Sequence, residues 1–395
     1  MIRAFLLSLR LHGRWWLEAF GREGRRAAPL GTRRLVVLLI GFPAFMLLQM
    51  LHWLAFLLDE VLFHGYRRVE VKAPLFVTGV PRSGTTFVHR ALARDESQFT
   101  TFHTWEALFA PAIVERKLIA ALAALDRHLG APLSRLVGKL NRRVTGGLAH
   151  IHEVGLQAAE EDYLTLLPAG GCFITVLAFP NSTSVWTLGR LPEMQEAERR
   201  VLLDFYHAML QKHLYAASPG RRLLSKNAAF GSWISELEAR YPDGRFLVCL
   251  REPTAALSSQ LSAIEGGLSL FGTTAAREAF TEGFRRNLAY VYRTLPALRD
   301  RLGADRLAVI DQGQLRRATA QTIERALDQL DLSVDEALRA ESAESERQDA
   351  GGERRHRHAA LRSGKAFDAL AAEVGGLHRE MTDAGLEQPN AVRRG

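Results

Sequence analysis

The sequence predicts an α/β fold of three layers, in which helices cover both faces of a central, mostly parallel sheet. From residue 72 onward, short apolar runs alternate with longer segments of helical periodicity, a pattern typical of βα units. A glycine-rich turn joins the first apolar run to the helix that follows it. Ahead of these units, residues 35–58 carry no formal charge. This run predicts an apolar helical extension at the N-terminus.

Individual strands and helices follow from periodicity and from their flanking residues. Ligands of a parallel sheet bind beyond the carboxyl ends of its strands, so the residues after each strand are the first place to look for a site. Strands are expected at residues 75–78, which end at Gly79, and at 223–225, 245–250 and 306–310, with a further β-rich run at 170–179. Helices are expected at residues 85–94, 111–140, 191–215, 231–240 and 318–330. Pro192 would lie in the first turn of the helix at 191–215.

Size and composition indicate one main catalytic domain over residues 71–395, preceded by an N-terminal segment over residues 1–70. The chain has 395 residues and a net charge of +8, which suits a phosphate-rich ligand, an anionic membrane or nucleic acid. Because the basic residues are dispersed and no zinc-binding or RNA-binding signature is present, we expect no nucleic-acid partner.

Cys172 and Cys249 lie in apolar runs interpreted as buried strands, which indicates a reducing, cytoplasmic compartment. The charged run at 340–358 is expected to form a flexible loop or lid.

The uncharged run at residues 35–58 is long enough to cross a hydrocarbon core of roughly 30 Å. Gly41 and Pro43 would bend such a helix, and Gln49 and His52 are unfavourable in lipid, which favours a re-entrant or interfacial helix. A single-pass span and a buried helical hairpin, covering the catalytic domain or a dimer interface, are the alternatives. The preceding residues add an amphipathic face, formed by Phe5, Leu6, Leu9, Trp16 and Leu17, with Arg3, Arg10 and Arg14 near the lipid headgroups.

The turn after the first strand has the spacing of a phosphate-binding loop. Residues 79–86, GVPRSGTT, follow a strand and open a helix, so that backbone N–H groups and the helix N-terminus converge on an anion. A nucleoside-triphosphatase loop carries lysine where this chain has Thr85, and without that lysine the loop is a poor site for cleaving ATP. Arg82 supplies a positive charge instead, and Thr85 and Thr86 add hydroxyl donors. The fold is therefore expected to be P-loop-like.

Residues 81–87, PRSGTTF, resemble the 5'-phosphosulfate loop of sulfotransferases that use 3'-phosphoadenosine 5'-phosphosulfate (PAPS). Their pattern is P-[KR]-[ST]-G-T-T-x, and the resemblance covers roughly residues 75–330. It implies that PAPS is the sulfuryl donor, that 3'-phosphoadenosine 5'-phosphate (PAP) is the product, and that no metal is required. The donor-binding residues that it implies in this loop are Arg82, Ser83, Gly84, Thr85, Thr86 and Phe87.

A second nucleotide contact is expected beyond the strand at 245–250. In the sulfotransferases, an arginine at such a strand end and a serine eight positions later bind the 3'-phosphate, and Arg251 and Ser259 have this separation. A guanidinium and a hydroxyl suit a dianionic phosphate that ATP lacks. Residues 223–227, LLSKN, with 241–246, YPDGRF, are similar to another sulfotransferase element. That element makes Lys226 a candidate cation near the transferred group, with an ordinary ion pair as the alternative.

A hydroxyl acceptor also needs a base to take its proton. The acidic run at residues 160–162 stands where related sulfotransferases often have such a cluster. Since adjacent carboxylates on a helix point in different directions, only one can face the site, and we choose Glu161 first and Glu160 second. A solvated acidic helix face is the alternative. Other candidate bases are His103, His150 and His152, whereas His89 is interpreted as a packing or surface residue.

These features predict a PAPS-dependent sulfotransferase of bacterial type that is cytoplasmic and membrane-associated. It would transfer a sulfuryl group to a hydroxyl of a small molecule, lipid, glycolipid or carbohydrate, and the sequence leaves the acceptor and the oligomeric state open. Positioning and electrostatics would carry catalysis, through Arg82, Lys226 and Glu161. The main alternative is a P-loop kinase of a small molecule, with Asp311 as the candidate Mg²⁺ ligand. A catalytically silent membrane scaffold is a further interpretation.

Overall fold

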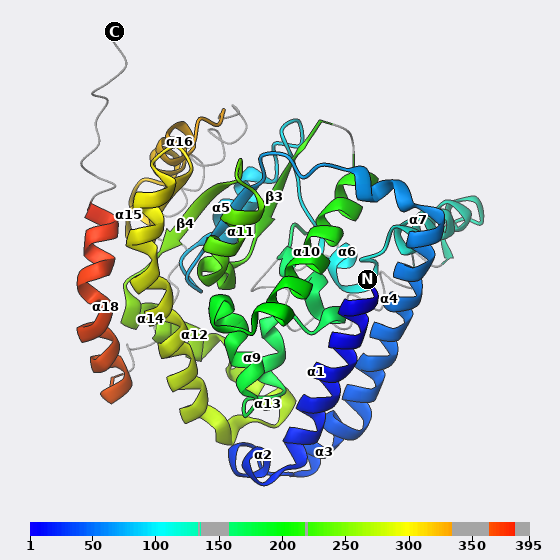
Figure 1. Ribbon diagram of the computed structural model, residues 1–395, viewed down its shortest axis with the longest axis horizontal. Helices are drawn as coiled ribbons and strands as arrows, with labels where there is room; N and C mark the ends of the chain where they lie inside the picture. Colours follow the sequence, from blue (N-terminus) through cyan, green and yellow to red (C-terminus); the bar gives the residue numbers. More distant parts are fainter. Residues whose placement is uncertain (133–134, 136–157, 218–219, 334–362, 384–395) are drawn as a thin grey trace.

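A five-stranded parallel sheet forms the centre of the molecule within the part of the chain that the structure describes (Figure 1). The structure is a computed structural model, and it describes residues 1–132, 135, 158–217, 220–333 and 363–383. The strand order is β2-β3-β1-β4-β5, which confirms the expected α/β fold. The strands are β1 (Leu75–Gly79), β2 (Phe99–Thr100), β3 (Arg222–Lys226), β4 (Arg245–Leu250) and β5 (Leu307–Asp311).

The side chains of the strands divide the core into two layers. Leu75 and Val77 of β1 belong to a cluster with residues of α5 (Thr85–Leu92) and α16 (Thr319–Gln329). Phe76, between them, stacks on Phe246 of β4 in a second and larger cluster. Successive side chains of a strand point to opposite faces, so both faces of the sheet are covered. The second layer includes α10 (Glu196–Ala216), α11 (Ile234–Arg240) and α14 (Arg277–Leu302).

The strand predicted at residues 170–179 is wrong. This segment contains a 3-10 helix, η4 (Phe173–Leu177), in which the N–H of Thr175 donates to the carbonyl of Cys172 at 3.2 Å. A short, wholly apolar run does not distinguish a buried strand from a buried helical turn. Cys172 is therefore buried outside the sheet, whereas Cys249 lies on β4, and both are free thiols. The sequence also missed β2, because a strand of two residues has no detectable alternation.

Most other boundaries shift by a few residues, whereas the helix expected at residues 111–140 already ends at His128. Pro192 lies in the 3-10 helix η5 (Leu188–Glu193) and not in the first turn of α10, because the extended backbone of Met194 separates the two helices. The polar run at 340–358 lies outside the described residues. The remaining α-helices of the catalytic region are α6 (Thr104–Phe109), α7 (Ile113–His128), α9 (Thr183–Thr187), α12 (Pro253–Ala263), α13 (Glu265–Phe271), α15 (Gln312–Arg317) and α18 (Lys365–Asp383).

The N-terminal residues form helices that pack along one flank of the molecule (Figure 1). A continuous helix over Thr32–Leu62 is long and apolar enough to cross a membrane, by length and composition alone. It consists of α3 (Thr32–Val36), a π-helical turn, η1 (Val37–Gly41), and α4 (Phe42–Leu62). The helix thus continues through Gly41 and Pro43 by way of a π-helical turn. Two further helices, α1 (Ile2–Phe20) and α2 (Arg22–Ala27), precede it.

A buried ion pair joins α4 to the catalytic region. The side chains of Asp59 on α4 and Lys212 on α10 are wholly buried, and Lys212 Nζ lies 2.7 Å from Asp59 Oδ2. The same carboxylate accepts hydrogen bonds from the N–H groups of Ile113 and Val114 at the start of α7, at 2.9 and 2.8 Å. The Lys212 ammonium also lies 3.9 Å from the centre of the Tyr66 ring. Three helices therefore meet at one carboxylate.

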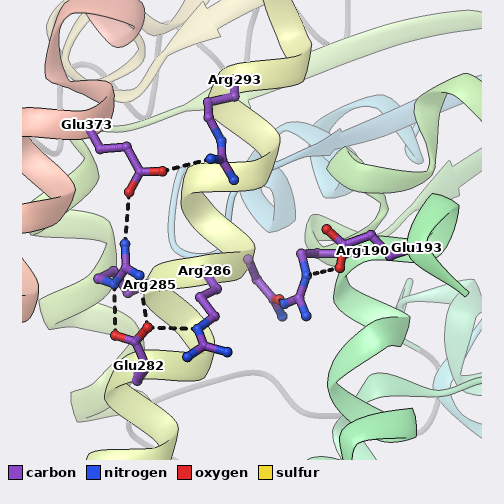
Figure 2. A network of polar contacts seen from close by, with 8 residues as sticks. Arg190, Glu193, Glu282, Arg285, Arg286, Arg293 and Glu373 are labelled. Atoms are coloured by element: carbon purple, nitrogen blue, oxygen red, sulfur yellow. Dashed lines mark hydrogen bonds and ion pairs between the residues drawn. The ribbon is translucent and has the colours of Figure 1, made fainter.

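The C-terminal helix α18 is joined to α14 by a network of charged side chains (Figure 2). Glu373 of α18 accepts from Arg285 at 2.8 Å and lies 3.0 Å from Arg293, both on α14. Arg285 and Arg286 also pair with Glu282 on α14. Phe367, Leu370 and Val374 of α18 are buried in the large core cluster. Charged and apolar contacts together hold α14, which forms one wall of the cavity described below.

Lys212→Met tests the buried pair, because it leaves the Asp59 carboxylate without a cation. We expect the free energy of unfolding to fall by about 3–5 kcal/mol, as measured by urea denaturation. The double variant Asp59→Asn with Lys212→Met removes both charges and should recover most of this loss. Lys72→Met, at an exposed lysine, is the control and should change stability by less than about 0.5 kcal/mol. Equal effects of Lys212→Met and Lys72→Met would contradict the prediction.

Candidate functional site

A cavity of about 610 Å³ adjoins the glycine-rich loop at the carboxyl ends of β1 and β3. This is the edge at which ligands of parallel sheets bind. On the loop side, the cavity is lined by Pro81, Arg82, Gly84, Thr85, Thr86 and Phe87, with Glu161 and Asn227 beside them. The opposite wall is largely apolar and includes Tyr163, Phe173, Ile174, Leu177, Ile264, Phe284, Leu288 and Val291.

The backbone of the loop is held in a tight turn. Gly79 has a φ of +135°, and a Cβ there would lie 2.0 Å from the carbonyl oxygen of Cys249, so only glycine fits. Gly84 has a φ of +99° at the start of α5. Arg82 has a φ of +66°, a strained conformation for a residue with a side chain, and such strain is concentrated at functional sites. The Ser83 hydroxyl donates to the carbonyl of Val80 at 2.6 Å and so stabilises the turn.

The structure brings Arg82, Arg251 and Ser259 together. Arg251 Nη1 donates to the carbonyl of Arg82 at 3.1 Å, and Arg82 Nε lies 3.4 Å from the Ser259 hydroxyl. Burial lowers the pKa of Arg251, and the neighbouring cations Arg316 and Arg82 lower it further. Converging guanidinium groups of this kind favour a multiply charged anion. Arg316 was not singled out from the sequence, although it lies on α15 directly after β5 and so at the expected edge of the sheet.

Glu161 lines the cavity and forms an ion pair with the buried Lys226. Lys226 Nζ makes a short contact with Glu161 Oε1, and the lysine side chain is only 4% exposed. The structure thus shows Lys226 in an ion pair, as its alternative interpretation expected. The partner of Lys226 is Glu161, the carboxylate that we chose as the base. Glu160 accepts a hydrogen bond from the N–H of Glu161 at 3.0 Å and does not line the cavity. Of these two carboxylates, Glu161 is the one that faces the cavity.

Asp162, the third carboxylate of the acidic run, is fully buried behind this pair. The Tyr206 hydroxyl donates to Asp162 Oδ2 at 2.6 Å and lies 3.1 Å from the Ser225 hydroxyl. Burial raises the pKa of Asp162 to about 6, although hydrogen bonds from Tyr206 and Ser225 oppose the shift. Asp162 neighbours Glu161 in the chain, and Ser225 neighbours Lys226. This buried connection therefore helps to set the position of both members of the ion pair, and sequence reasoning did not identify it.

The other candidate residues lie elsewhere. His89 is fully buried, with Nε2 2.8 Å from the Thr101 hydroxyl, and His103 caps α6 through contacts with Glu106. Asp311, the candidate Mg²⁺ ligand of a kinase, caps α15 by accepting from the N–H of Gln314 at 3.1 Å. Among the described residues, no three His, Cys, Asp or Glu side chains gather into a metal-binding group. The candidate bases His150 and His152 lie outside the described residues.

Comparison with known proteins agrees with this geometry. A model of the sulfotransferase family matches residues 74–167 and 177–336, more than half of the chain. The chain belongs to the sulfotransferase family. The solved structure of sulfotransferase STF9 from Mycobacterium avium is similar, with a TM-score of 0.62 and 18% identity, covering 97% of this chain and 96% of that one.

Sulfotransferase STF1 from Mycobacterium tuberculosis H37Rv is also similar in fold, with a TM-score of 0.62 and 16% identity, covering 95% of this chain and 98% of that one. At such identity the two structures support the fold. No curated protein sequence gives a significant match. Sulfotransferases are transferases, so the family also supports an enzyme of that class.

Asp162→Asn tests the buried carboxyl group of this sulfotransferase. The folded chain keeps the Asp162 proton up to about pH 6, whereas an unfolded chain releases it at lower pH. This residue therefore makes stability fall as the pH rises from about 4 to about 6. As the pH rises from about 4 to about 6, the free energy of unfolding of the variant should therefore increase relative to that of wild type by up to about 3 kcal/mol. Urea denaturation at several pH values measures the difference, with Asp305→Asn, at an exposed carboxylate, as the control.

Proposed function

We propose that this sulfotransferase moves the sulfuryl group of PAPS to the hydroxyl of an apolar acceptor, such as a lipid or glycolipid. The observation that carries the proposal is the convergence of Arg251 and Ser259 on the strained loop residue Arg82. That arrangement offers charge-assisted hydrogen bonds to two separate phosphate positions of one nucleotide. An apolar cavity opens beside it. Donor and acceptor can thus meet at the carboxyl edge of the sheet.

In the proposed reaction, the acceptor oxygen attacks sulfur in line with the departing phosphate oxygen. A sulfur–oxygen bond to the acceptor forms while the sulfur–oxygen bond to the 5'-phosphate breaks, and PAP leaves. The loop N–H groups, Arg82, Thr85 and Thr86 hold the phosphosulfate, as in phosphoryl-transfer loops. Lys226 stabilises charge on the departing oxygen, and Glu161 takes the acceptor proton. Their ion pair supports these roles, because it holds the lysine cation next to the carboxylate that lines the cavity.

The residues of the cavity wall favour an apolar acceptor over a free sugar. Facing the loop, the wall consists mainly of aromatic and aliphatic side chains from η4 and α14, with Asn287 among the few polar ones. A site for a carbohydrate needs many hydrogen-bond partners for its hydroxyl groups, because buried polar groups left unpaired cost free energy. An alkyl or ring system with one hydroxyl group fits this wall better. The sugar of a glycolipid would have to remain near the loop.

We also propose that the protein is cytoplasmic and works at a membrane surface. The apolar helix over Thr32–Leu62 supports this, since several of its leucines are exposed. A membrane would supply acceptors that are too apolar to dissolve in water. The kinase alternative has less support, because Thr85 replaces the phosphate-binding lysine and Asp311 is engaged as a helix cap.

Arg251→Ala should weaken PAP binding by about 10–100-fold, because it removes a charge-assisted hydrogen bond to the 3'-phosphate. Binding of adenosine 5'-phosphosulfate, which has no 3'-phosphate, should stay nearly unchanged. Arg245→Ala, at the other end of β4, is the matched control and should bind PAP as wild type does. Calorimetry measures these affinities. A wild-type preference for ATP with Mg²⁺ over PAP would replace the sulfotransferase proposal with the kinase alternative.

Glu161→Gln should lower kcat by about 10²–10⁴-fold, because the acceptor hydroxyl loses its base. PAP affinity should change little, since the loop and the arginines remain. Glu160→Gln is the matched control, because Glu160 does not line the cavity, and it should keep most of the activity. The assay follows transfer from radiolabelled PAPS to long-chain alcohols and glycolipids. If Glu160→Gln were the inactive variant, the assignment of the base would be wrong.

A further inference from the structure

Three neighbouring helices expose an unusual number of large apolar side chains. They are α1, α4 and α7, and α4 contacts both of the others: Phe5 packs on Trp53, and His52 Nδ1 lies 2.6 Å from Glu115 Oε1. Soluble monomers rarely expose so large an apolar surface without a partner for it. We call this surface the leucine face, and its members are Ile2, Leu6, Leu9 and Leu17 on α1, Leu47, Leu51, Leu54, Leu57, Leu58, Val61 and Leu62 on α4, Leu118, Leu122 and Leu125 on α7, and Leu129 directly after α7.

The exposed residues recur every three or four positions, which places them on one side of each helix. On α4 the series from Leu47 to Leu62 contains no charged residue among its exposed members. On α7 the exposed Leu118, Leu122 and Leu125 follow the same spacing, although α7 lies in the family-matched region and outside the N-terminal segment. The apolar surface therefore extends beyond residues 1–70.

The opposite side of the long helix contacts the rest of the protein near the start of the helix, in its second half and near its end. Arg34 is buried near its start, Trp53 Nε1 donates to the carbonyl of Pro168 at 3.1 Å, and Asp59 pairs with Lys212 near its end. A helix that crosses a bilayer must meet lipid or other membrane-embedded protein around its whole circumference, over roughly 30 Å. This helix instead has the catalytic region along one side. It can meet lipid only by lying parallel to the membrane surface.

Basic side chains flank the leucine face at both ends. Arg22, Arg25 and Arg26 are exposed on α2, just before the long helix, and Arg68 is exposed just after it, next to Arg67, which pairs with Glu60. Anionic lipid headgroups complement such arginines at the edge of an apolar surface. A second copy of this chain is a poorer partner, since arginines would face arginines whichever way the two long helices ran.

We infer that the leucine face is the docking surface for an anionic lipid bilayer, with α4 lying flat in one leaflet and α7 entering the lipid beside it. This inference rests on the proposed membrane association and adds its orientation and a contact from α7. It also gives a reason for the position of the polar residues Gln49, His52 and Asp59, which are buried against the protein and away from the lipid.

Vesicle flotation tests the contact made by α7. The wild-type protein should float with phosphatidylcholine vesicles that contain phosphatidylglycerol, and much less with phosphatidylcholine alone. The triple variant Leu118→Ser, Leu122→Ser, Leu125→Ser should bind the anionic vesicles about 10-fold more weakly or worse. The matched control carries methionine at the same three positions, which keeps them apolar, and should bind as wild type does. PAP binding by the triple variant shows that it is folded.

Each outcome of this experiment decides a different point. If wild type does not float, both the membrane association and the leucine face are overturned, whereas the donor proposal is judged separately by PAP binding. If wild type and the serine variant float equally, the contact by α7 is wrong and the membrane association stands. If wild type forms a dimer in the absence of vesicles and the serine variant does not, the face is an interface between two copies.

Depth measurements test the orientation of the long helix. Single cysteines at Leu39, Leu51 and Val61, all exposed, would carry an environment-sensitive fluorophore, since Cys172 and Cys249 are buried. On anionic vesicles all three labels should be quenched alike by a shallow lipid quencher, because a flat helix keeps them at similar depth. A label at Leu51 quenched mainly by a deep quencher, with shallow labels at both ends, would show a spanning helix and overturn the inference.

Discussion

The close approach of β1 and β4 at Gly79 is the constraint on which the site depends. A side chain at Gly79 would collide with the carbonyl of Cys249, and the next N–H, from Val80, donates to that same carbonyl at 3.1 Å. The loop after β1 therefore begins directly against the end of β4. Arg251 follows β4 at once, so its guanidinium can reach the carbonyl of Arg82. Two elements that we propose to bind phosphate, far apart in the sequence, thus lie side by side.

A second arrangement completes the cavity. Glu161, Tyr163 and the residues of η4 come from the segment between α7 and α10. Tyr163 and η4 face the loop across the cavity together with α14, whereas Glu161 lies on the loop side. The position of Glu161 depends on the buried contacts of Asp162 with Tyr206 and, through it, with Ser225 next to Lys226. Outside the cavity, the charged network between α14 and α18 supports the wall that α14 provides (Figure 2). The chemistry proposed for the cavity would thus rely on contacts that lie behind it.

The leucine face and the catalytic cavity belong to one folded unit. Asp59 joins α4, α7 and α10, and Trp15 of α1 is buried in the same cluster as residues of the cavity wall. A surface proposed to meet lipid and a cavity proposed to take an apolar alcohol are therefore rigidly connected. That connection fits an enzyme whose acceptor reaches it from a membrane, since binding at the surface would keep the cavity close to its substrate.

The sequence by itself determined the elements whose signals are local. The strand at 245–250, the loop from Gly79 to Thr86 and the spacing of Arg251 and Ser259 depend on neighbouring residues, because glycine, proline and alternating apolar side chains act over a few positions. Only the tertiary structure decided what depends on contacts between distant segments. It made residues 170–179 a cavity wall and not a strand, paired Lys226 with Glu161, added Arg316 to the arginine cluster, and bound one side of the long apolar helix to the protein. Periodicity shows that a residue is apolar or charged, but the partner that a side chain meets is set by packing.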